Sequence, residues 1–402
     1  MVNRRVVMVL LLMGCKLPIS ECFFRCENGH CAGEFVCGQD GYCHGDGKIT
    51  GCGVSIVDGG TDGGSTCVGC VDPNGGPYNY VFVTSTTYVP GQEFVGLAGA
   101  DAKCAERASA GGLPGTFKAW LSTSTLNARD RFPSWRGWIR PDKRPFADSM
   151  SSLLDQGQVF YPPRIDEFGN DLVGSQELAA TGTTPGGTKD ANTANDWTKG
   201  TGYAAGVPAW TTGYWSGDSQ RAGGLAARLY CFGANYNRPL SPVRAQGRIA
   251  FLSAQAFVPS SLKAADDQCT GDATSHGLPG TFLALLATQS ASASARFDLT
   301  GPNWVRLDGM PWLENAGDLA QTKLLTALNV MLDKTFQSDI LGWGGAPDFS
   351  SSAVNDAENC ANWTSATQTG TVGRSSASDG AFFNALSDDC GSDAPHLYCL
   401  QN

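Results

Sequence analysis

The chain has 402 residues, of which 42% are hydrophobic, so it is long enough for two or three domains with real cores. Its formal net charge of −10 argues against broad nucleic-acid binding. Fifteen cysteines and 51 glycines in a chain with only 16% charged residues indicate an oxidising compartment.

The N-terminus predicts export. An apolar run at 6–13 follows two arginines and is far shorter than the ~20 residues that a membrane helix needs. The run ends within the tetrapeptide LMGC, which is similar to a bacterial lipobox and closes at Cys15. This similarity implies that residues 1–14 are a signal peptide, that Cys15 is lipidated, and that the protein is anchored at the outer membrane or cell surface. The alternative is an ordinary signal peptide followed by a chance cysteine.

A cysteine-rich segment follows at 15–70. Eight cysteines lie between positions 22 and 70, a density similar to that of EGF modules. Because the segment holds too few apolar residues for a core, we expect disulfide bonds to stabilise it. The sequence does not choose among the possible pairings. Zinc held by these thiols together with His30 and His44 is the alternative.

The rest of the chain contains one sequence unit twice. Cys104 and Cys269 each lie eight residues before an identical hexapeptide, GLPGTF. Six identical residues at an identical distance from a cysteine indicate two homologous domains. The chain therefore divides into the signal peptide at 1–14, the cysteine-rich module at 15–70, a linker at 71–78, repeat 1 at 79–233, a linker at 234–246 and repeat 2 at 247–402.

Each repeat is expected to begin with a strand, and repeat 1 continues with a helix and a second strand. A β-branched and aromatic run predicts the first strand at 81–89, and good helix formers predict a helix at 100–110. Alternation of apolar and polar residues then predicts a strand with one buried face at 117–121. In repeat 2 the corresponding strands are expected at 249–258 and 282–286.

The six cysteines of the repeats predict three disulfide bonds. Repeat 1 has only two cysteines, while repeat 2 has two at matching positions and two more. Alignment of the repeats places Ala194 opposite Cys360 and Ala222 opposite Cys390, so both halves of an inner bridge are missing from repeat 1 together. The expected bonds are Cys104–Cys231, Cys269–Cys399 and Cys360–Cys390.

A family resemblance rests on these features. The stretch GADAKCAERASAGGLPGTFKAWLS at 99–122, with the nested cysteine order of repeat 2, resembles endostatin, the C-terminal domain of certain collagens. The resemblance implies an α+β fold with two tandem C-type-lectin-like (endostatin-like) domains, whose twisted sheets are mostly antiparallel, after the small disulfide-rich module. Bacterial surface lipoproteins with endostatin-like repeats look similar, and members of that group are adhesins for host matrix and complement regulators.

The metal and heparin sites of endostatin are only partly matched. Endostatin binds zinc through N-terminal histidines, whereas repeat 1 has no histidine and we expect His276 and His396 of repeat 2 to be structural. Heparin binding needs clustered arginines. Repeat 1 offers a basic run that is otherwise a solvated face: Arg129, Arg131, Arg136, Arg140, Lys143 and Arg144, interleaved with Trp135 and Trp138.

A calcium-dependent lectin site is possible in repeat 2. Counted from the inner cysteines, repeat 2 retains carboxylates at three positions of the lectin pattern, Asp348, Glu358 and Asp388. Calcium takes six to eight oxygen ligands, so backbone and water would have to complete the shell. Repeat 1 lacks these carboxylates, and a decayed loop is the alternative.

Repeat 1 instead offers aromatic side chains among small residues. Exposed rings in this segment would stack on sugars or anchor a protein partner, whereas buried rings would fill the core. The candidate ligand-binding residues are Trp197, Tyr203, Trp210, Tyr214 and Trp215.

The sequence contains no recognised catalytic motif. Repeat 1 has no histidine to act as a base, and G-x-S-x-G, H-E-x-x-H and phosphate-binding glycine loops are absent. We therefore expect a non-catalytic surface lipoprotein that binds an extracellular polysaccharide or matrix-type protein, without a required cofactor. A structural envelope protein without a specific ligand, and an enzyme on a lectin-like fold, are the alternatives.

Overall fold

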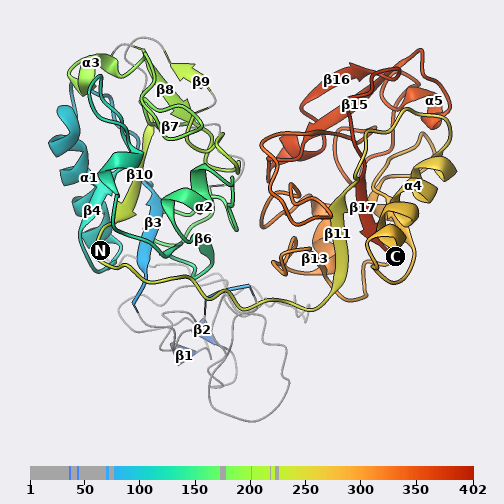
Figure 1. Cartoon of the computed structure of the whole chain (residues 1–402), viewed down its shortest axis with the longest axis horizontal. Coiled ribbons are helices and arrows are strands. Elements are labelled where there is room, and N and C mark those ends of the chain that lie inside the picture. Colours follow the sequence, from blue (N-terminus) through green and yellow to red (C-terminus); the bar gives the residue numbers. More distant parts are fainter. Residues whose placement is uncertain are drawn as a thin grey trace, which may run out of the picture. The chain divides into compact units, whose positions relative to one another are not determined.

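A computed structural model of the chain describes residues 36–37, 43–44, 69–71, 77–172, 178–200, 202–217, 219–221 and 226–402 (Figure 1). The chain divides into two compact units, Met1–Cys67 and Val68–Asn402. In the first unit, strands β1 (Val36–Cys37) and β2 (Cys43–His44) pair antiparallel. The predicted signal peptide, Cys15, His30 and Ala222 lie outside the described residues, as do the side chains of most of the cysteine-rich module.

The second unit is a mixture of helices and sheets in which strands predominate. Repeat 1 contains β3 (Asn79–Val83), α1 (Gly96–Ala110), β4 (Phe117–Ala119), η2 (Arg129–Arg131), β5 (Trp138–Ile139), β6 (Pro145–Ala147), α2 (Met150–Leu154), β7 (Ala179–Ala180), α3 (Ala194–Trp197), β8 (Tyr203–Gly206), β9 (Ser219–Arg221) and β10 (Arg228–Gly233). Its strands form one sheet in the order β6-β5-β3-β10-β7-β8-β9, and β4 also pairs with β10. The pairs β3–β5 and β7–β10 are parallel, and the others are antiparallel.

Repeat 2 opens with the same order of elements as repeat 1, from the first strand to the strand after the 3-10 helix, and its strands form two separate sheets. It contains β11 (Arg248–Leu252), α4 (Leu262–Ser275), β12 (Phe282–Ala284), η3 (Ser294–Arg296), β13 (Trp304–Arg306), η4 (Ala316–Gln321), β14 (Leu341–Trp343), α5 (Cys360–Trp363), β15 (Thr369–Arg374), η5 (Gly380–Phe382), β16 (Leu386–Asp389) and β17 (Tyr398–Gln401). One sheet has the order β12-β17-β11-β13 and the other β14-β15-β16. Only β11 and β13 pair in parallel.

The opening helix and strand have the predicted types but different limits. Helix α1 begins four residues before the predicted start, and α4 begins after Ser261, whose side chain accepts a hydrogen bond from the backbone of Ala264. The first strand of each repeat is shorter than predicted, because β3 and β11 each end after five residues. Turn residues then carry the chain into the helix.

Disulfide bonds fasten each helix to a central strand. Cys104 joins Cys231, and Cys269 joins Cys399, so that α1 is bonded to β10 and α4 to β17. The third bond, Cys360–Cys390, closes a shorter loop within repeat 2. These three pairs are the ones expected from the alignment of the repeats. The half-cystines of each bond are buried beside the apolar side chains of the helix and sheet.

The described residues of the predicted linkers make specific contacts. Val71 pairs in a β-bridge with Pro242, and its side chain packs with Tyr78 and Ile139. Leu240 donates its backbone N–H to a carboxylate oxygen of Asp148 at 2.7 Å. The connection between the repeats therefore contacts repeat 1 through Leu240, and it contacts repeat 2 through Ala245, whose backbone N–H donates to the Gly309 carbonyl oxygen at 2.8 Å.

Candidate functional site

Most of the predicted aromatic ligand platform is buried. Trp197, Tyr203 and Trp215 are at most 1% exposed. The Trp197 indole N–H donates to the Ser122 carbonyl oxygen at 2.7 Å, and the Trp215 ring packs against the Trp120 ring with centroids 5.1 Å apart. The prediction that these three rings contact a ligand is wrong, because they fill the core of repeat 1.

The other two aromatic residues face repeat 2. Trp210 and Tyr214 are half-buried, and the Arg374 guanidinium lies 5.3 Å and 5.9 Å from their ring centroids. The Trp210 indole N–H also donates to the Asp379 carboxylate at 3.2 Å. These rings therefore join the two repeats.

The three carboxylates of the predicted calcium site do not come together. Asp348 accepts hydrogen bonds from the backbone N–H groups of Ser350 and Ser351. Glu358 accepts one from the backbone N–H of Val354 at 2.6 Å, and Asp388 accepts one from the backbone N–H of Asp389. No group of three or more histidine, cysteine or acidic residues that would hold a metal ion occurs among the described residues. The retained carboxylates serve local turns, so the predicted trio is not a site.

The basic run of repeat 1 is paired internally. A polyanion would have to compete with these partners, so the run is not a free basic face. The pairs are Arg129–Asp155, Arg131–Asp101, Arg136–Asp148, Arg140–Asp142, Arg144–Glu314, and Lys143 with the Tyr80 hydroxyl. Of the two histidines of repeat 2, His396 contacts the Ser253 carbonyl oxygen through Nδ1 at 2.7 Å, and the exposed His276 contacts that of Asp272 at 3.0 Å.

Each repeat contains the same left-handed turn. The four residues of α3 have φ between 49° and 65°, and the four residues of α5 have φ between 52° and 67°. None of the eight is glycine, and left-handed backbone costs such residues about 1–2 kcal/mol each. The turns end at Trp197 and Trp363, whose indole N–H groups donate to equivalent carbonyl oxygens, those of Ser122 and Ala287.

The turn holds a neighbouring loop through one side chain. In repeat 1, Asp196 accepts both the backbone N–H of Ser124 at 2.6 Å and its hydroxyl at 2.7 Å, which lowers the pKa of Asp196. In repeat 2, Asn362 accepts the backbone N–H of Gln289 at 2.8 Å. We call the surface formed by 123–127 with 194–198, and by 288–291 with 354–363, the turn edge of each repeat.

Each turn edge carries an exposed apolar side chain. Val354 of repeat 2 is 79% exposed, and Leu126 of repeat 1 is 37% exposed. Their backbones are fixed, since Val354 N–H donates to Glu358 and the carbonyl of Leu126 accepts from Thr123 N–H at 2.8 Å. Each turn edge therefore presents one exposed apolar side chain on an ordered backbone.

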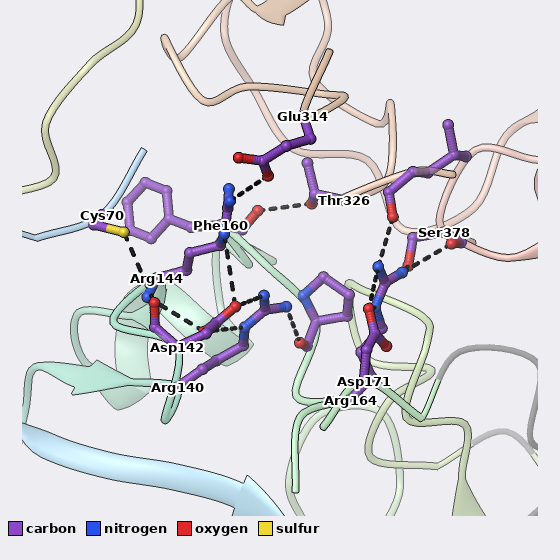
Figure 2. A network of polar contacts seen from close by, with 12 residues as sticks. Cys70, Arg140, Asp142, Arg144, Phe160, Arg164, Asp171, Glu314, Thr326 and Ser378 are labelled. Atoms are coloured by element: carbon purple, nitrogen blue, oxygen red, sulfur yellow. Dashed lines mark hydrogen bonds and ion pairs between the residues drawn. The ribbon is translucent and has the colours of Figure 1, made fainter. Parts of the chain in front are cut away.

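Polar side chains join the repeats at a second location (Figure 2). The buried guanidinium of Arg164 in repeat 1 donates to the Ser378 carbonyl oxygen at 2.9 Å and to the Leu324 carbonyl oxygen at 2.6 Å in repeat 2. Asp171 pairs with the same guanidinium at 2.9 Å. Asp171 thus balances the charge of Arg164 within repeat 1, while the hydrogen bonds donated by Arg164 hold repeat 2.

Further contacts surround Arg164. Arg144 pairs with Glu314 at 2.5 Å, and the Thr326 hydroxyl donates to the Phe160 carbonyl oxygen at 2.7 Å (Figure 2). Tyr161 lies beneath two arginines, and burial raises its pKa to about 12, so the phenol is neutral at physiological pH. These groups are structural partners of one another.

No family model and no curated protein matches the chain. Over the described residues, no helix combines the length and the apolar character that crossing a membrane requires.

Sequence reasoning missed the turn edge and the contacts between the repeats. The matching segments DANTANDW and DAENCANW marked the position of the left-handed turns, but the Asn and Asp residues that favour left-handed backbone also occur in other turns and do not by themselves predict four such residues in a row. The interface uses arginines and small residues that also occur on solvated faces, so composition alone does not identify it.

Proposed function

We propose that the protein is a non-catalytic, lipid-anchored surface protein that binds an extracellular ligand through two endostatin-like, C-type-lectin-like repeats. The observation that carries the proposal is the turn edge, which both repeats build around four left-handed residues although their sequences differ. Backbone strain persists only where the surrounding structure enforces it, and it is concentrated at binding and catalytic sites.

The turn edge favours a protein as the ligand. Sugar-binding surfaces use exposed aromatic rings, but three of the five candidate rings are buried and the other two contact repeat 2. Val354 and Leu126 instead offer aliphatic side chains, and a protein partner that covers them would remove apolar surface from water. A matrix-type protein is therefore the ligand that we favour over a polysaccharide.

The expected anchor at Cys15 is part of the same proposal. Lipidation would hold the repeats at the outer membrane or cell surface, where matrix proteins are accessible. A structural envelope protein without a ligand remains the second candidate, since the left-handed turns also position Trp197 and Trp363 in the two cores.

Binding assays with substitutions at the turn edge test the proposal. The mature protein is titrated onto immobilised collagen, laminin and fibronectin, and onto heparin as a polysaccharide. We expect binding to at least one of the three proteins. Val354→Asp or Leu126→Asp should weaken it about tenfold or more, because a charge would be buried at the centre of the contact.

A control and three other outcomes complete the test. Val258→Asp introduces the same charge at a side chain that is 45% exposed and lies outside the turn edge, so it should leave binding unchanged. Binding that tolerates both turn-edge substitutions would assign the ligand to another surface. Binding to heparin alone would favour a polysaccharide ligand, and no binding to any of the four would favour the structural protein.

A further inference from the structure

The two repeats touch through equivalent backbone positions. Trp210 and Ala377 form an antiparallel β-bridge between the repeats. Each of them also donates its backbone N–H to the carbonyl oxygen three residues earlier, Trp210 to Val207 and Ala377 to Arg374, both at 3.0 Å. Trp210 and Ala377 therefore occupy equivalent positions in matching turns of the two repeats.

A pair of glycines supports this equivalence. Gly206 and Gly373 each precede the bridge residue by four positions. A Cβ atom at Gly206 would overlap the carbonyl oxygen of Trp215, and one at Gly373 would overlap that of Phe382. Because the same close approach recurs at the same spacing, the segments from Gly206 to Trp210 and from Gly373 to Ala377 align without an insertion or deletion.

The hydrogen bonds of the bridge are related by a local two-fold axis. Thr211 N–H donates to the Ser376 carbonyl oxygen at 2.8 Å, and Ser378 N–H donates to the Ala209 carbonyl oxygen at 3.0 Å. Exchange of the two repeats converts one bond into the other. An interface in which the same surface is used on both sides is the mark of a two-fold dimer.

A second pair of equivalent residues crosses the same interface. Arg164 and Asn329 each lie two residues before a four-residue turn. In both turns the backbone N–H of the last residue donates a hydrogen bond to the carbonyl oxygen of the first. Arg164 donates to the Ser378 hydroxyl at 2.7 Å, and Asn329 donates to the Thr212 hydroxyl at 2.5 Å. Under the exchange that relates the bridge hydrogen bonds, the counterpart of Ser378 is Thr211, so this pair of side-chain contacts follows the two-fold relation with a shift of one residue.

The side chains on the axis have diverged in size. Trp210 packs against the apolar cluster of repeat 2 that contains Ala377, which is fully buried. Arg374 covers the same ring, while its counterpart in repeat 1 is Val207. The contact between a large residue on one side and a small residue on the other exists only between repeat 1 and repeat 2.

We infer that the repeats are an intrachain dimer whose two-fold interface has become specific for pairing repeat 1 with repeat 2. The partner that each surface fits is the equivalent surface of the other repeat. Two copies of repeat 1 would place two tryptophans on the axis, and two copies of repeat 2 would place two alanines there and leave a void. Complementary size therefore selects one pairing and disfavours association between separate molecules through this surface.

Exchange of the axis residues tests the inference in the intact mature protein. Ala377→Trp puts two tryptophans on the axis and should split the single thermal unfolding transition that we expect for the paired repeats. Trp210→Ala should lower the unfolding temperature of that transition. The double variant with Trp210→Ala and Ala377→Trp restores one large and one small residue, so it should recover a single transition.

Calorimetry supplies the readout, with Ala385→Trp as the matched control because Ala385 is exposed in the same repeat. The control should unfold like the wild type. Two outcomes would overturn the inference: a single unchanged transition in Ala377→Trp, or a double variant whose loss equals the sum of the two single losses. Recovery in the double variant cannot arise from nonspecific damage to repeat 2, since that damage would persist.

Discussion

Asp379 links the pH dependence of stability to the contact between the repeats. Its carboxylate is mostly buried, accepts the Trp210 indole N–H, and lies near Arg164. Burial raises the pKa of Asp379 above its usual value of 3.8, and the hydrogen bonds and the arginine reduce that shift. The folded protein therefore binds this proton more tightly than the unfolded chain does.

The raised pKa predicts the sign of a pH effect. The contribution of Asp379 to the free energy of unfolding is complete below pH 3.8 and is lost as the pH rises through the folded pKa. Asp379→Asn keeps an oxygen acceptor for Trp210 and removes the titration. Urea unfolding at about pH 3 and pH 7 should show the variant gaining stability relative to the wild type as the pH rises.

A carboxylate with the opposite shift provides the control. The hydroxyl and backbone N–H of Thr335 lower the pKa of Asp333, so its stabilising contribution is present at neutral pH and is lost on acidification. Asp333→Asn should therefore lose stability relative to the wild type as the pH rises. Equal pH trends for the two variants would contradict the assignment at Asp379.

Burial of individual aromatic residues was the least predictable feature. A tryptophan among glycines and threonines is compatible with both a ligand platform and a core, because the same apolar area serves either role. Trp197 and Trp210 show the difference, since one is enclosed by its own repeat and the other by repeat 2. Only the three-dimensional packing decides between the two.

The opening helix and strand were predictable because local chemistry specifies them. Helix formers, a terminating Gly-Gly pair and an alternating strand pattern agree at 96–119, and the structure has the expected element types there. The left-handed turns of α3 and α5 follow the opposite rule. Asn195, Asp196 and Asn362 belong to types that adopt φ > 0, but the other five residues do not, so contacts from the rest of each repeat impose the conformation.

The inner disulfide of repeat 2 should be dispensable for the turn that it adjoins. Repeat 1 builds the same left-handed turn with Ala194 where repeat 2 has Cys360. The combined Cys360→Ala and Cys390→Ala variant should keep the fold and lose about 3.5 kcal/mol of unfolding free energy, as the chain-entropy model gives for a loop of 30 residues. Urea unfolding measures this loss.

Circular dichroism in the near ultraviolet checks the fold of that variant, because Trp363 is the last residue of the substituted turn. A variant with Cys104→Ala and Cys231→Ala is the comparison, since it opens a loop of 127 residues and should lose about 5 kcal/mol. Loss of the Trp363 signal in the inner variant would mean that the disulfide, and not the surrounding packing, enforces the turn.

The contact between the repeats could not be predicted from the sequence, although the duplication itself could. Tandem domains on an interdomain linker usually move independently, and the segment at 234–246 has the composition of such a linker. The structure instead joins the repeats through a β-bridge, the buried Arg164 and the Arg144–Glu314 pair. Such contacts depend on surface complementarity between residues more than a hundred positions apart, which no local pattern encodes.

Cleavage of the connection between the repeats tests how strongly this interface holds them. Arg238 and Pro239 are exposed, so a protease recognition sequence inserted between them should be cut without disturbing either core. None of the three described disulfides links repeat 1 to repeat 2. The two fragments should nevertheless elute together in size-exclusion chromatography under native conditions, because the buried interface remains. The same cut in the Ala377→Trp variant should release them, whereas separation of the fragments of the wild-type sequence would show that the covalent connection holds the pair.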